Sequence, residues 1–109
     1  MDGIIAGEGS GPLVPRPVCS GIVLGGTNPA AVDAVAAALM GFDPECLPVV
    51  ANAFHGEAYG IGRGRWQDLE VISNCASWNR SLGRIQAGDS FHFEPHFGWK
   101  GHVERHSVR

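Results

Sequence analysis

The clearest hydrophobic pattern along the chain runs through residues 29–40. Apolar side chains recur there at steps of three and four residues, at Val32, Val35, Ala36 and Leu39. Asn28 can accept hydrogen bonds from the first free amides, and Pro29 suits the first helical position, where no amide donor is needed. Gly41 follows as a typical C-terminal cap. The pattern predicts a helix over residues 29–40 with one buried face.

Two other segments have the pattern of strands. Residues 18–26 have a continuous apolar centre rich in branched side chains, which is typical of a strand buried on both faces. Residues 68–73 alternate polar and apolar positions, which predicts a second strand. Residues 82–87 fit either a strand or a turn, and the sequence leaves both open.

Proline and glycine positions predict the remaining boundaries. Asp43 can cap a short helix or turn that begins at Pro44, and a further helix is expected over residues 49–55. Glycines alternate along residues 7–12 and 59–65, so both segments are predicted to be loops. The tail over residues 100–109 is expected to fray.

These elements predict an α/β fold with a small sheet of about three or four strands and two or three helices. Residues 1–109 have the length of one domain. So few strands make a poor sheet alone, however. We therefore expect either a single domain or the C-terminal fragment of a larger three-layer α/β domain, which pairs with a copy of itself or with another chain.

Composition narrows the classes of function. Hydrophobic residues make up 44% and charged residues 17%, which excludes disorder driven by charge. The formal net charge of -3 gives no basic surplus for nucleic acid or an anionic membrane. The sequence shows no apolar run of transmembrane length and no signal-peptide pattern, so a cytoplasmic location is expected.

The three cysteines, Cys19, Cys46 and Cys75, are widely spaced. They form no CxxC pair, which argues against a disulfide framework, a zinc knuckle or an iron–sulfur cluster held by this chain alone. Free thiols are expected.

A first candidate site lies at Gly7, Glu8, Gly9 and Gly11. Alternate glycines allow backbone amides to point at an anionic ligand. The spacing is neither the dinucleotide fingerprint nor a P-loop. Glu8 is a candidate metal ligand or acid–base group, and the alternative is a solvated loop charge.

A second candidate site lies at Thr27 and Asn28, where a Gly-Gly turn leads into the predicted helix. Free amides at a helix N-terminus bind anions readily, although an ordinary capped helix start is the alternative. Asp33 follows in an apolar run, and a half-buried carboxylate there needs a partner such as a metal, a ligand or a loop amide.

Three motifs together resemble a known family. They are the run Asp2-Gly3-Ile4-Ile5-Ala6-Gly7-Glu8-Gly9-Ser10-Gly11-Pro12, the run Gly25-Gly26-Thr27-Asn28-Pro29-Ala30-Ala31-Val32-Asp33-Ala34-Val35-Ala36, and Met40-Gly41-Phe42-Asp43-Pro44. In order and spacing they resemble the C-terminal part of the domain-of-unknown-function family numbered three-six-two, over residues 2 to about 62.

The resemblance implies a protein associated with redox or iron–sulfur metabolism, with Asp2, Glu8 and Asp33 as the best matches for a metal site. Members of the family are usually longer, with a preceding α/β half that a partner chain would have to supply here. Many carry ferredoxin modules whose cysteine runs are absent from this chain. Asn28 stands where the family usually has aspartate.

Three functions follow as hypotheses. The first is a carboxylate- and glycine-lined site for a divalent metal or an anionic ligand. The second is a redox or iron–sulfur accessory protein without a cofactor of its own. The third is a structural protein that dimerises or docks on a partner chain. Whether the chain is an enzyme stays open, since the sequence shows no nucleophile–base pair at a recognisable elbow.

Overall fold

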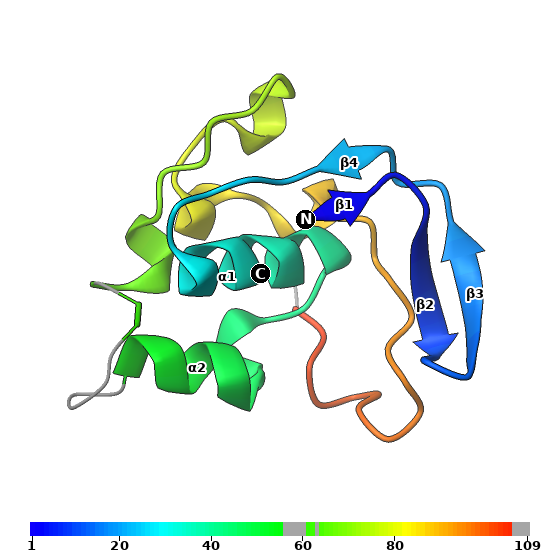
Figure 1. The fold of residues 1–109 in the computed structure, drawn as a ribbon. Helices are drawn as coiled ribbons and strands as arrows, with labels where there is room; N and C mark the ends of the chain where they lie inside the picture. The colour runs from blue at the N-terminus through cyan, green and yellow to red at the C-terminus, as the bar shows by residue number, and fades with distance from the viewer. Residues whose placement is uncertain (56–60, 63, 106–109) are drawn as a thin grey trace.

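A computed structural model describes residues 1–55, 61–62 and 64–105 (Figure 1). Its strands are β1 (Asp2–Gly3), β2 (Ala6–Ser10), β3 (Val14–Val18) and β4 (Ile22–Val23), and its helices are α1 (Pro29–Met40) and α2 (Pro48–His55). Two antiparallel pairs, β1 with β4 and β2 with β3, form separate small sheets. The sheet of β1 and β4 lies on one side of α1 and helix α2 on the other (Figure 1). The predicted α/β class is confirmed; a larger three-layer domain stays a prediction.

Helix α1 has the bounds that its sequence predicts. The Asn28 side chain accepts hydrogen bonds from the amides of Ala30 and Ala31. Gly41 ends the helix with a φ of 88°, a conformation that favours glycine. A side chain at this position would also come within 2.9 Å of the Ser90 hydroxyl. The buried face is wider than the predicted stripe, because an unbroken run from Ala34 to Ala38 is buried.

The prediction of a loop over residues 7–12 is wrong for most of that segment. Residues 6–10 form β2, which pairs with β3 so that Gly7 faces Pro17 and Gly9 faces Pro15. The Gly9 amide donates outward, to the carbonyl of Glu94, so the Gly9–Pro15 pair exchanges no ladder bonds and the missing proline amide costs nothing. At Gly7 a side chain would come within 3.1 Å of Pro15. Glycine in one strand therefore accommodates proline in the other.

The two strands predicted outside the β2–β3 hairpin are shorter than expected. The expected strand over 18–26 is reduced to β4, which pairs with β1 in the register Asp2↔Val23 and Gly3↔Ile22. In the expected strand over 68–73, only Glu70 makes an isolated bridge, with Ser81. A strand needs a neighbour on at least one edge, and these segments find little pairing in the described part of the chain.

The predictions for the short elements after α1 are mostly confirmed, and the predicted fraying of the chain end is not seen up to residue 105. Asp43 caps the 3₁₀ turn Pro44–Cys46, and α2 begins one residue before its predicted start. Residues 82–84 adopt the turn alternative. Residues 59, 60 and 63 of the loop predicted over 59–65 lie outside the described residues. The chain end, expected to fray from residue 100, is held up to residue 105, because Arg105 donates to the carbonyl of Gly41 and Val103 is buried.

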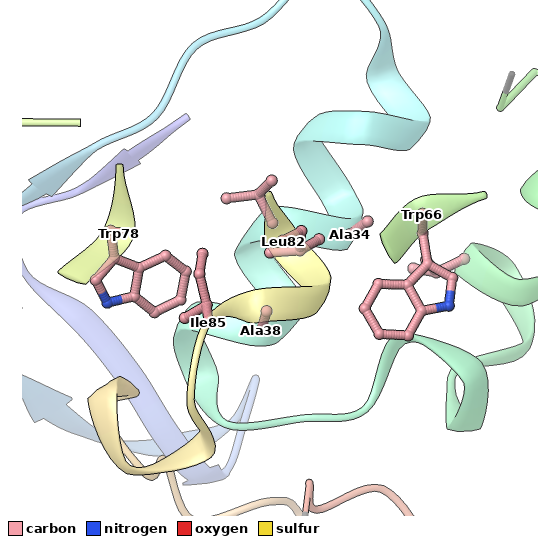
Figure 2. Close-up of a cluster of buried hydrophobic side chains, with 8 residues drawn as sticks. Ala34, Ala38, Trp66, Trp78, Leu82 and Ile85 are labelled. Carbon is pink, nitrogen blue, oxygen red and sulfur yellow. The ribbon is translucent and has the colours of Figure 1, made fainter. Parts of the chain in front are cut away.

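The core lies between α1 and the irregular segment that follows α2. Figure 2 shows its centre, which is formed by Ala34, Ala38, Trp66, Trp78, Leu82 and Ile85. Both buried indoles find acceptors for their N–H groups: Trp66 donates to the Glu45 carboxylate at 2.6 Å and Trp78 to the carbonyl of Asp89 at 3.0 Å. Small side chains on α1 let the large ones approach the helix closely.

We predict that Leu82→Ala lowers the free energy of unfolding by about 2–5 kcal/mol, because it leaves a cavity in the packed core. Leu82 is 0% exposed, whereas Leu13 is 92% exposed and serves as the matched control. Leu13→Ala is expected to change the value by less than about 0.5 kcal/mol. Urea denaturation followed by tryptophan fluorescence measures both. Equal losses in the two variants would contradict this description of the core.

Candidate functional site

The three carboxylates predicted as metal ligands do not share one environment in the structure. Glu8 accepts a hydrogen bond from the Glu94 amide at 2.8 Å and lies 3.8 Å from the Arg16 guanidinium. Asp2 accepts from the amide of Ile4 at 3.0 Å. Asp33 is exposed on α1, which corrects the expectation that it is half buried. The described residues contain no group of three or more His, Cys, Asp or Glu side chains placed to hold a metal ion.

The glycines of the first candidate site surround a hollow of about 330 Å³ together with Glu8 and Glu94. Their amides are largely in use, since Gly9 donates to the carbonyl of Glu94 and Gly11 to that of Gly9. These bonds tie the hairpin to residues 93–95 and to itself. Anion binding by Gly7, Gly9 and Gly11 stays a prediction, but the amides of Gly9 and Gly11 already donate hydrogen bonds within the chain.

The second candidate site contains a capped helix start. Asn28 accepts from two amides of α1, and its side-chain amide donates to the carbonyl of Ile61 at 2.9 Å. Thr27 and Asp33 line a hollow of about 340 Å³ at this end of the helix. Asp2 and Glu8 line different hollows, so the structure does not bring the three carboxylates to one place.

A longer depression runs over α1 and was not anticipated from the sequence. It consists of two adjoining hollows of about 360 and 300 Å³ that share Leu24, Val35, Val71 and Ile72. We call this depression the α1 groove. One wall is residues 21–28, the other is residues 69–75, and α1 contributes Ala31, Val32, Val35 and Leu39 beneath them.

The first wall presents the free edge of β4. Met1 and Leu24 exchange hydrogen bonds in both directions, at 2.7 and 2.9 Å. In an antiparallel pair, the next residue then turns its own N–H and C=O away from the partner strand. The backbone polar groups of Val23 therefore point away from β1, toward the groove.

The second wall is built in the same way. Val71 donates to the carbonyl of Arg80, and Leu82 donates to that of Leu69, on either side of the Glu70–Ser81 bridge. This is the arrangement in which the bridged pair itself exchanges no hydrogen bonds. The N–H and C=O of Glu70 therefore point away from Ser81, toward the groove.

Side chains on both walls alternate as they do in a sheet over a helix. Leu24, Leu69 and Val71 turn inward and pack against the core. Val23 and Ile72 turn outward and are 76% and 93% exposed. The signal for these walls was present in the sequence as the alternation of 68–73 and the apolar centre of 18–26. What the sequence did not show is that the two segments flank an open space.

Two exposed cysteines have thiol pKa values that are shifted in opposite directions, and one of them lines the groove. Cys75 lines the groove with its sulfur 3.3 Å from the Ser77 hydroxyl, and this hydrogen bond lowers the pKa of the thiol. At Cys46, partial desolvation of the thiol and the nearby charges of Asp43 and Glu45 raise its pKa. Both residues are exposed. Cys75 should therefore report on the groove, with Cys46 as an internal reference.

Comparison with known proteins leaves the chain without a match: no family model, no curated protein and no solved structure is similar enough to count. The resemblance to the family numbered three-six-two therefore stays a prediction. No helix in the described residues combines the length and apolar character needed to cross a membrane.

We predict that Glu8→Ala speeds hydrogen exchange at the Glu94 amide by roughly threefold to tenfold, because that amide loses a charged acceptor. NMR-detected exchange in heavy water measures it. Glu70→Ala removes a carboxylate from a distant segment and is the control, expected to leave the Glu94 amide unchanged. If Glu8→Ala also leaves it unchanged, Glu8 does not hold residues 93–95 to the hairpin.

We predict that iodoacetamide modifies Cys75 several-fold faster than Cys46 at neutral pH, because the thiolate is the reactive form and the two pKa values are shifted in opposite directions. Peptide mapping by mass spectrometry follows each thiol in the same sample. Equal rates, or a faster Cys46, would show that the Ser77 contact does not activate Cys75.

Proposed function

We propose that this protein is a docking module that takes an extended segment of a partner chain into the α1 groove as an added strand. The observation that carries the proposal is that both walls turn backbone N–H and C=O groups toward the space between them. Such edges are templates for strand addition, a common mode of peptide recognition.

The dimensions and lining of the groove support an extended occupant. Its longer wall is residues 21–28, where the positive φ of Gly21 and the bend at Thr27 leave residues 22–26 between them. Five extended residues span about 16 Å at roughly 3.3 Å per residue. Its floor is apolar at Val35 and Leu39, so alternate side chains of an added strand would be buried there. A strand of about five residues fits this space, and a seven-residue peptide covers it with one residue to spare at each end.

An added strand would also complete the architecture that the sequence predicts. With it, β1, β4, the new strand and residues 69–73 would form one layer over α1. That layer has the three or four strands expected for a stable small sheet, which the described chain divides into pairs and isolated segments.

Strand docking has more structural support than the metal or anion site and the redox accessory role that the sequence also suggested. A metal site needs several carboxylates in one place, whereas Asp2, Glu8 and Asp33 line three different hollows. The role of a redox or iron–sulfur accessory protein is a further proposal that rests on the family resemblance alone.

Val23→Pro tests the proposal, because proline removes the Val23 N–H that would bond an added strand. That N–H is not used in the ladder with β1, and Ile22 already has the extended conformation favoured before proline. The control Val23→Thr keeps the N–H and the β-branched side chain. Circular dichroism checks that both variants are folded.

The probe is a fluorescein-labelled seven-residue peptide of alternating valine and threonine, titrated by fluorescence polarisation. We predict that Val23→Thr binds it like the original protein and that Val23→Pro binds it roughly twofold to tenfold more weakly, the cost of one hydrogen bond. Equal affinities for the two variants, or no binding by the original protein, would overturn the proposal.

A further inference from the structure

We infer that the segment taken up by the α1 groove is basic, with lysine or arginine on its outward face and apolar residues on its inward face. The inference rests on the proposed docking function and adds the chemistry of the partner. It follows from the charges around the groove and from the direction in which the wall side chains point.

The charge of the groove has one sign. Among the described residues that line it, both charged ones are acidic: Asp89 in the larger hollow and Glu70 in the smaller. Asp33 lines the hollow that adjoins the groove at the start of α1. Two positive groups lie next to the groove residues: the α-amino group of Met1, which already donates to the carbonyl of Leu24, and Arg80, whose carbonyl accepts from the Val71 amide behind the second wall. Neither lines the groove. A basic strand would therefore meet complementary charge along its length.

Outward positions on the two walls would interact with outward positions of the added strand. Glu70 turns outward beside Ile72, because Leu69 and Val71 on the same wall pack inward. Directly opposite and diagonal side chains on neighbouring strands lie about 5–8 Å apart, within reach of a lysine or arginine. The exposed side chains of Val23 and Ile72 offer apolar surface for the aliphatic stems of these residues.

The same charges argue for another protein rather than a second copy of this chain. The chain carries a formal net charge of -3. In a symmetric pair that meets groove to groove, Glu70 and Asp89 would approach like charges. A basic segment from a different chain avoids this repulsion.

The experiment compares three seven-residue peptides with the same inward valines. Their outward residues are lysine, threonine or glutamate, and binding to the full chain is measured by fluorescence polarisation at low and at high salt. We predict that the lysine peptide binds roughly tenfold more tightly than the glutamate peptide at low salt, with threonine between them, and that the difference shrinks as salt rises.

A matched pair of variants locates the effect. Glu70→Gln keeps an acceptor for the Ser81 hydroxyl while removing the charge, so it should narrow the difference between the lysine and glutamate peptides. Glu94→Gln removes a charge beside the hairpin, outside the groove, and should not narrow it. Bound lysine peptide should also slow alkylation of Cys75 relative to Cys46, because Cys75 lines the groove.

The outcomes separate this inference from the docking function itself. Equal affinity for all three peptides, or a preference for glutamate, overturns the basic partner and leaves strand docking standing. Failure of all three peptides to bind overturns both. Concentration-dependent dimerisation in the ultracentrifuge, with Cys75 protected in the dimer, would make a second copy the occupant and also overturn the inference.

Discussion

The burial of helix α1 is the constraint on which the rest of the structure depends. Its run from Ala34 to Ala38 is buried without interruption, so neighbours must approach the helix from several sides. Alanine permits this because its side chain is small, so neighbouring segments can pack close to the helix axis. Leu82, Ile85 and the two buried tryptophans fill the space around it (Figure 2). The α1 groove lies where the cover is incomplete: β4 and residues 69–73 flank the helix without meeting over it.

Local features of the fold could be predicted where one residue determines one geometry. Asn28 and Gly41 define the ends of α1 because an N-cap needs a side-chain acceptor and an αL cap needs a flexible backbone. Pairing between distant segments could not be predicted in this way. The Gly-rich run beside Glu8 has the composition of a loop, and only its alignment with Pro15 and Pro17 makes it a strand. Likewise, the alternation of residues 68–73 predicts a half-buried extended segment but not which neighbour it has.

The candidate site residues show a similar division. The sequence singled out Glu8 and Asn28 for their chemistry, and both have specific polar partners in the structure. Those partners belong to the chain itself: Glu8 holds residues 93–95 to the hairpin, and Asn28 caps α1 and binds the carbonyl of Ile61. Asp33 was expected to be half buried because it follows apolar neighbours, but the helix turns it toward solvent. The groove depends on two walls that are about fifty residues apart, a relation that no local motif encodes.

Strand docking requires the backbone edges of Val23 and Glu70 to be open and aligned for an added strand. Hydrogen exchange at these two amides, measured by NMR with and without the lysine peptide, tests it most directly. Strand docking predicts fast exchange at both amides in the free protein and protection of both when the peptide is saturating. Protection already present in the free protein, or amides that stay unprotected with peptide bound, would contradict it.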